Sequence, residues 1–187
     1  MEVSTSLLVA LMFITILSIG IAHVLAGLAA LVDVRSPMSI ERLHTSWMVL
    51  LLLVQFNLFW HTTALLAVED WAFTEFVLIM IGPILAYFAS HILVPTPGDT
   101  DTGLRSRYLR MSGRFFVVLA ALQLWTILAD LQLGSGFTAA SALNLGLAVL
   151  CAALAVSKSV SFHTVVTMAT LLVFVAGGVF RARGIID

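Results

Sequence analysis

Polar side chains that could hold a cation or move a proton gather toward one end of several apolar segments. This outer group comprises Asn57, His61, Glu69, Asp70, Glu75 and Asp130. Asn57 precedes His61 by one helical turn. Gln123, Thr126 and Asp130 follow one another at i, i+3 and i+7, so they share one helix face. If both faces point inward, an imidazole and a carboxylate can meet and bind a cation or relay a proton. The alternative is a hydrated rim with ordinary hydrogen bonds.

A second set of polar residues lies toward the opposite ends of the segments. This inner group comprises His44, His91, Arg114 and His163, with Lys158 close by. His163, Thr167 and Thr170 share one helix face, and an imidazole with two hydroxyls can line a narrow wet path. The hydroxyls can equally bond to backbone carbonyls of their own helix. Histidines at this level can sense pH, because imidazole titrates near neutrality, or they can contact lipid head groups.

His23 stands apart, near the middle of the first apolar run. Gly20 and Gly27 lie on its face and leave room for a bulky group such as a haem or another helix. A haem with two histidine ligands needs a second histidine at the same depth, and none is predicted at a matching level. We therefore expect no cofactor, with a haem at His23 as the alternative. The single cysteine, Cys151, excludes an internal disulfide and a cysteine-based metal cluster.

The elements that must position these residues are membrane-spanning helices. Of 187 residues, 61% are hydrophobic and 10% are charged, and the mean hydropathy is +1.11. A soluble domain carries about 25% charged residues, so lipid is the solvent that fits this composition. Six apolar runs, each near the roughly 20 residues that cross the hydrocarbon layer, predict an all-α polytopic bundle in one domain. The runs cover residues 7–31, 45–68, 72–94, 113–133, 138–157 and 160–180.

Basic residues predict the orientation and the partners. The net charge of −1 provides no field that would attract nucleic acid. Most basic residues lie on one side, which the positive-inside rule makes cytoplasmic: Arg35, Arg42, Arg105, Arg107, Arg110, Arg114 and Lys158. With six spans, Arg181 and Arg183 fall on the other side. The cluster of four arginines from Arg105 to Arg114 largely precedes a span, which favours binding of anionic lipid over voltage sensing.

Small residues, proline and tryptophan predict how the helices pack. Two stripes recur every four residues: Ser18, Ala22, Ala26 and Ala30, then Ala140, Asn144, Ala148 and Ala152. This spacing lets helix backbones approach closely in lipid, so we expect both stripes inside the bundle. Association of identical chains into a homo-oligomer is a further possibility. Pro83, preceded by Gly82, is expected to kink the third span. The four tryptophans, Trp47, Trp60, Trp71 and Trp125, are expected to be lipid anchors near the membrane faces.

Four segments of the sequence carry a resemblance to known proteins: His44 to Trp60 (HTSWMVLLLLVQFNLFW), Trp71 to Phe76 (WAFTEF), Ile81 to Pro95 (IGPILAYFASHILVP) and Arg114 to Phe116 (RFF). Together they resemble a group of small uncharacterised bacterial multi-pass membrane proteins. The resemblance covers residues 44–116 and implies a bacterial inner-membrane location. It implies no activity and no site residue.

These observations leave three functions open. The first is conduction or coupled transport of a small cation, with the proton favoured, along Asn57, His61, Glu75, Gln123, Asp130, His163, Thr167 and Thr170. The second is a non-catalytic membrane subunit or sensor that acts by association. The third is a redox protein that holds haem through histidines. A hydrolase is disfavoured, because no metal-ligand motif such as H-E-x-x-H occurs and no catalytic residue stands out.

The orientation can be checked on one engineered cysteine. In a Cys151→Ala background, Thr102→Cys lies in the arginine-bearing connection and is expected to be cytoplasmic. A membrane-impermeant thiol reagent added to intact cells should leave it unlabelled until the cells are opened. Labelling in intact cells would reverse the orientation.

Overall fold

The computed structural model describes residues 4–32, 42–94 and 104–182, and its regular elements are all helical in these ranges. The elements are α1 (Thr5–Val32), α2 (Arg42–His61), the 3-10 helix η1 (Thr62–Ala67), α3 (Phe73–Leu93), α4 (Leu104–Gln132), α5 (Ala139–Val156) and α6 (Val160–Ala182). Five of the helices, α1 to α5, are long and apolar enough to cross a membrane, α2 together with η1. The all-α transmembrane bundle predicted from the six apolar runs is confirmed.

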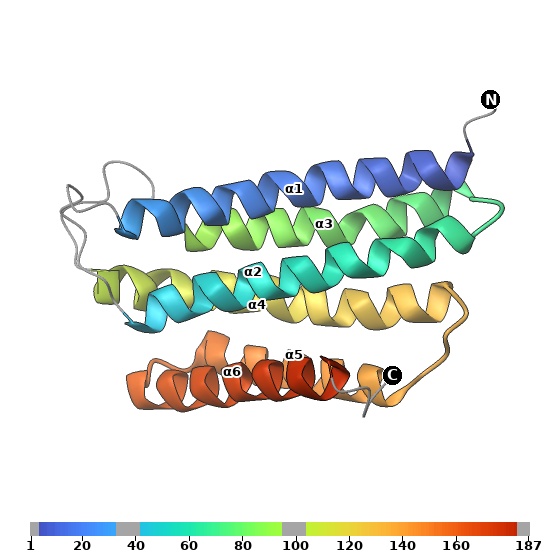
Figure 1. The fold of residues 1–187 in the computed structure, drawn as a ribbon. Coiled ribbons are helices and arrows are strands. Elements are labelled where there is room, and N and C mark those ends of the chain that lie inside the picture. Colours follow the sequence, from blue (N-terminus) through green and yellow to red (C-terminus); the bar gives the residue numbers. More distant parts are fainter. Residues whose placement is uncertain (1–3, 33–41, 95–103, 183–187) are drawn as a thin grey trace.

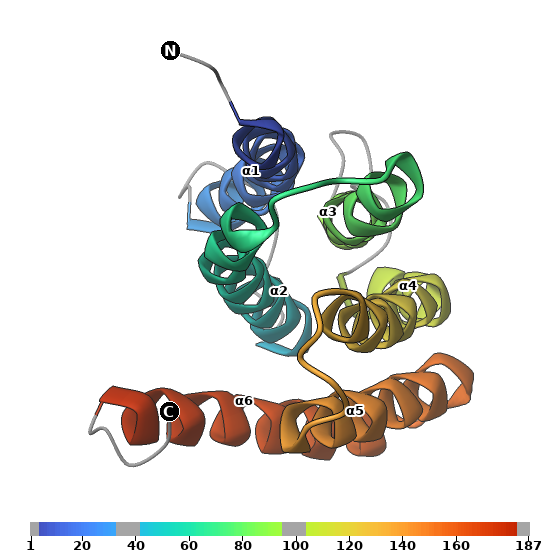
Figure 2. The same cartoon turned by 90° about the vertical axis from the view of Figure 1, so that its right-hand side faces the viewer.

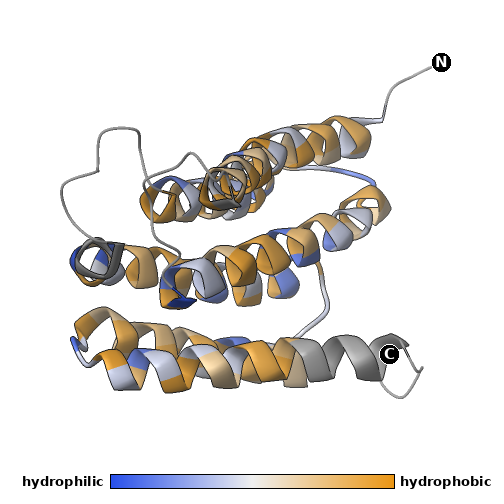
Figure 3. Cartoon of the chain, turned by 60° about the vertical axis from the view of Figure 1, so that its left-hand side comes forward, coloured by the Kyte–Doolittle hydropathy of each residue, from blue (hydrophilic) through white to orange (hydrophobic). Residues whose placement is uncertain are grey.

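The helices form a four-helix bundle with a pair laid beside it. Figure 1 shows α1 to α4 running side by side, and Figure 2, which views them nearly end-on, shows α5 and α6 as a separate layer inclined to them. Within this arrangement α1 packs chiefly on α3, α3 on α4, and α4 on α5, while α6 lies against α2. We call the ends near Arg42, Arg110 and Lys158 the inner ends and the opposite ends the outer ends. Apolar residues cover most of the helix surfaces in Figure 3, as lipid requires.

The fourth helix begins earlier than its apolar run suggests. The run was predicted over 113–133, with 95–112 as a polar connection, but α4 starts at Leu104. Leu, Arg and Met are good helix formers, so the helix extends through this arginine-rich stretch. Its outer end closes with Gly134 and Gly136 in left-handed conformations, φ 80° and 68°, which glycine adopts without strain. Thr138 then caps α5, because its side chain accepts a hydrogen bond from the Ser141 N–H at 3.3 Å.

The expectation for the small-residue stripe of α1 is wrong. Ser18, Ala22, Ala26 and Ala30 are exposed on the outside of the bundle. The buried face instead carries Leu17, Gly20, Val24, Gly27 and Leu31. The two glycines provide the close approach: a Cβ at Gly20 would lie 3.4 Å from the Tyr87 Cα, and one at Gly27 would lie 2.8 Å from the Val94 Cγ1. In α5 the stripe divides, with Ala148 buried and Ala140 and Ala152 exposed.

Gly82 forms a contact between α3 and α4. The Trp125 indole lies over Gly82, and its Nε1–H donates to the Leu78 carbonyl at 2.7 Å. Trp125 is buried, and so is Trp47, which packs on Phe116 of α4, so the lipid-anchor expectation is wrong for both. Trp60, which is 74% exposed, has the position expected of a lipid anchor. Gly82 has a packing role, since the absence of a side chain there makes room for the indole.

The contact between Gly82 and Trp125 predicts that Gly82→Ala, a small change in side-chain volume, destabilises the protein. A Cβ at Gly82 would lie 2.2 to 2.4 Å from three ring carbons of Trp125. Gly82→Ala should lower thermal stability in detergent by the equivalent of about 1–3 kcal/mol, because the indole must move. Gly146→Ala is the control, since nothing lies within 4 Å of its Cβ position. A mid-helix glycine-to-alanine change ordinarily stabilises by up to about 1 kcal/mol. Equal melting shifts for the two variants would contradict the contact.

Candidate functional site

Three buried side chains from three helices meet near the inner end. His44 on α2 and His163 on α6 are wholly buried, and Tyr108 on α4 is 1% exposed. We call these residues the inner cluster. Tyr108 Oη lies 2.7 Å from His163 Nδ1, and His163 Nε2 lies 3.0 Å from the Ser157 carbonyl oxygen. These two contacts attach the start of α6 to α4 and to the end of α5.

The contacts of His163 define its tautomer. A carbonyl oxygen can only accept, so Nε2 carries the hydrogen and donates it to Ser157. In a neutral imidazole Nδ1 is then the acceptor, and the Tyr108 hydroxyl donates to it. In this tautomer the Tyr108 hydroxyl covers the lone pair of His163 Nδ1. This is an arrangement that can accept a proton only if the hydroxyl turns away.

Aromatic rings enclose the inner cluster. The His44 ring meets Tyr108 edge-on at 6.5 Å between centroids, and Phe116 meets His163 at 5.4 Å. Trp47 packs against Phe116 at 4.8 Å and closes the side toward the middle of the bundle. The rings keep water away and strengthen electrostatic interactions within the cluster.

The two threonines that follow His163 are satisfied by their own helix. Thr167 Oγ1 donates to the His163 carbonyl at 2.6 Å, and Thr170 Oγ1 donates to the Val166 carbonyl at 2.8 Å. Their donors are therefore not available to a path. Their oxygens keep acceptor capacity, and Thr170 lines a cavity in the middle of the bundle.

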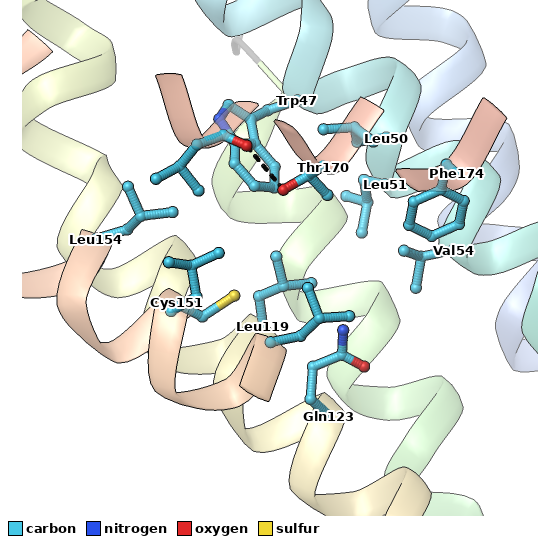
Figure 4. Close-up of a pocket in the computed structure, with 13 residues that line it drawn as sticks. Trp47, Leu50, Leu51, Val54, Leu119, Gln123, Cys151, Leu154, Thr170 and Phe174 are labelled. Carbon is cyan, nitrogen blue, oxygen red and sulfur yellow. Dashed lines mark hydrogen bonds between the residues drawn. The ribbon is translucent and has the colours of Figure 1, made fainter. Parts of the chain in front are cut away.

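This cavity lies between α2, α4, α5 and α6 (Figure 4). Its volume is about 20 Å³, and its lining is apolar apart from Gln123, Cys151 and Thr170. A single water molecule needs about 10–15 Å³, so the cavity can hold one but not an open column. Gln123 reaches its wall from α4, and its carboxamide can accept from and donate to a water at that point.

At the outer end, His61 and Asp130 are near enough to interact electrostatically. Asp130 is half-buried near the end of α4, and it interacts electrostatically with the exposed His61 of α2. No ion pair within 4 Å joins these two described residues. Asn57, one turn inward on α2, is exposed on the outside of the bundle. Glu69 and Asp70 are exposed in the connection before α3.

Glu75 belongs to the helix ends of α3 and α4. Its Oε2 accepts from the Ala72 N–H at 3.1 Å, which satisfies the first turn of α3. Its Oε1 accepts from Gln132 Nε2 at 2.8 Å and so joins the outer ends of the two helices. Both carboxylate oxygens of Glu75 therefore accept hydrogen bonds that stabilise the helix ends. Glu75 is not part of the His61–Asp130 pair.

A second buried polar pair lies in the three-helix core of α1, α2 and α3. Gln55 and Ser90 are wholly buried, and Gln55 Nε2 donates to Ser90 Oγ at 2.7 Å. The Ser90 hydroxyl donates a hydrogen bond to the Ala86 carbonyl at 2.8 Å. Gly20 makes room for the pair, because a Cβ there would lie 2.8 Å from Gln55 Nε2. The Gln55 Oε1 atom is buried with no protein partner.

His23 has a neighbour that the sequence analysis did not place. The ring of His91 on α3 stacks on it, with centroids 5.6 Å apart, so the expectation that no histidine shares its depth is wrong. The reason is the parallel packing of α1 on α3, which brings Gly27 against Val94 and so sets His23 level with His91. His23 Nε2 is buried without a hydrogen-bond partner. Among the described residues, no group of three or more His, Cys, Asp or Glu could hold a metal ion.

Comparisons with protein-family models, with curated proteins and with solved structures found no match to this chain. The resemblance of residues 44–116 to small bacterial membrane proteins therefore stays a prediction, as does the bacterial inner-membrane location.

The bond that holds His163 can be tested through stability. Tyr108→Phe removes the hydroxyl and leaves His163 Nδ1 as a buried acceptor without this donor. Such a loss costs about 1–3 kcal/mol, so the melting temperature in detergent should fall. Tyr87→Phe is the matched control, because the half-buried Tyr87 makes ring contacts with Phe88 and His91 and no described hydrogen bond through its hydroxyl. Equal melting temperatures for the Tyr108 and Tyr87 variants would contradict a stabilising hydrogen bond between Tyr108 and His163.

Proposed function

We propose that the protein moves protons across the membrane along the seam between α2, α4 and α6. The observation that carries the proposal is the order of polar groups in this seam. The inner cluster with His163 lies at one end, the cavity with Gln123 lies in the middle, and His61 with Asp130 lies at the other end. Polar groups buried in hydrocarbon cost stability, so polar groups at three depths of one seam are candidates for a function.

Each group has a defined part in a proton relay. At the inner end, the Tyr108 hydroxyl turns and offers its oxygen, and His163 Nδ1 takes up a proton. In the middle, one water in the cavity exchanges hydrogen bonds with the Gln123 carboxamide and the Thr170 oxygen. At the outer end, Asp130 accepts and releases the proton beside His61.

The packing between these groups implies slow, gated movement. Leu119 and Val166 line the central cavity and are 4% and 5% exposed, so no continuous water column is present. Transfer from one group to the next requires the helices to separate enough to admit further water. The least constrained helix is α6, since its described packing is mainly against α2. Movement of α6 away from α4 would also break the Tyr108–His163 bond, which couples opening to the protonation of His163.

The test is proton flux in proteoliposomes that contain a pH-sensitive dye. An imposed potential should drive uptake above protein-free liposomes. Gln123→Leu, His163→Gln and Asp130→Asn should each lower it about tenfold or more, since a positioned proton-transfer group contributes about 10²–10⁴-fold. Asp70→Asn and Asn57→Ala are the controls, because both residues are exposed outside the seam, and they should leave flux unchanged.

Two results would contradict the proposal. One is flux that never exceeds that of protein-free liposomes at any pH between 5.5 and 8. The other is flux that falls equally in the control variants, which would show that transport does not depend specifically on the residues of this seam.

A second candidate function is association with another membrane helix. The exposed stripe of Ser18, Ala22, Ala26 and Ala30 on α1 is the specific observation that favours it, because small residues on an outward face permit a close helix–helix contact. The mass of the purified protein in detergent decides between a monomer and a complex. An Ala26→Leu protein whose mass is unchanged would count against this face.

A further inference from the structure

An open apolar groove lies at the outer ends of α1 and α3, away from the proton seam. Its α1 wall includes Leu8, Val9 and Met12. Its other wall includes Phe73 and Phe76 of α3 and Trp71 of the connection before it. The groove measures about 410 Å³, a volume within the range of about 300–1,000 Å³ that is typical of ligand pockets.

The groove has a fixed floor and an exposed rim. Val9 is buried, whereas Leu8 is 56% and Phe73 is 78% exposed. The Ser6 hydroxyl donates to the Val68 carbonyl and ties the first turn of α1 to the connection that leads into α3. The two walls are thus held by the chain itself, and the groove does not depend on an occupant for its shape.

One wall carries a hydrogen-bond donor without an acceptor. The indole Nε1 of Trp71 is buried and has no protein partner. A buried indole N–H normally finds an acceptor. The Nε1 atom is not accessible from the open groove, so an occupant reaches it only when the indole turns toward the groove. Such an occupant must combine an apolar body, to cover the lining, with an oxygen acceptor at one end. The ester carbonyl of a membrane phospholipid meets both requirements at the depth where tryptophan is enriched.

The charges beside the groove select among phospholipids. Glu69 and Asp70 are exposed directly before Trp71, and the sequence holds no Lys or Arg between Arg42 and Arg105. Carboxylates repel an anionic head group and attract an ammonium group. We propose that the groove binds one acyl chain of a phospholipid whose head group carries an ammonium, with the Trp71 N–H on its ester carbonyl and the ammonium beside Glu69 and Asp70.

The test measures lipid bound to delipidated protein in detergent by native mass spectrometry. Phosphatidylethanolamine and phosphatidylglycerol with the same acyl chains are titrated separately. The wild type should bind one phosphatidylethanolamine severalfold more tightly than phosphatidylglycerol. Leu8→Trp places a large ring in the groove and should lower that binding about tenfold. The control is Leu11→Trp, a change at a residue of α1 that is 50% exposed and outside the groove, and it should bind like the wild type.

Two further variants examine the polar contacts. Trp71→Phe keeps a ring and removes the N–H, so binding should weaken about 2- to 10-fold, the range expected from a hydrogen bond of about 0.5–1.5 kcal/mol. Glu69→Gln with Asp70→Asn should make the two lipids bind alike. The proposal is overturned if Leu8→Trp and Leu11→Trp, with equal melting temperatures, bind lipid equally, because lipid would then only coat the surface. It is also overturned if the wild type prefers phosphatidylglycerol. Neither result depends on proton flux.

Discussion

The constraint on which this structure depends is that polar groups inside hydrocarbon must find partners within the protein. Several of the described ones do so within their own helix, as Thr167 and Thr170 do by donating to carbonyls of α6. Where the partner lies on another helix, the pairing also decides which helices meet. The Trp125 indole of α4 donates to a carbonyl of α3, and Gln55 of α2 donates to Ser90 of α3. The polar groups are therefore part of the packing as well as candidates for function.

Seen in this way, α4 is the helix that organises the bundle. Near its inner end Tyr108 holds His163 of α6, and farther out Trp125 occupies the space left by Gly82 of α3. Its outer end carries Asp130, which interacts electrostatically with His61 of α2. The proposed proton seam follows one face of this helix from Tyr108 past Gln123 to Asp130. A relay built on α4 can be coupled to the movement of α6, whose described packing against the other helices is sparser than that of α5.

The sequence predicted the helices well and the contacts between them poorly, and both outcomes have one physical cause. Lipid forces each long apolar run to satisfy its backbone as a helix, so hydropathy alone locates the spans. The same lipid makes the outward face of a helix as apolar as the inward face, so patterning does not say which face packs. For this reason the stripe from Ser18 to Ala30 was placed inside when Gly20 and Gly27 form the contact. Tyr108 precedes the apolar run 113–133, so hydropathy does not place it in a helix, although Tyr108, Ser112, Phe115 and Leu119 have helical spacing. Gln55 and Ser90 were passed over as isolated polar residues in apolar runs.

The proposed relay depends on the hydrogen bonds of His163, which donates through Nε2 to the Ser157 carbonyl and accepts at Nδ1 from the Tyr108 hydroxyl. Solid-state nitrogen NMR of the protein in bilayers, with labelled histidine and a His163→Gln sample to assign the signal, reports both ring nitrogens directly. We expect a protonated Nε2 and an unprotonated Nδ1 at pH 8. A proton on Nδ1 at that pH, or an unprotonated Nε2, would contradict this arrangement.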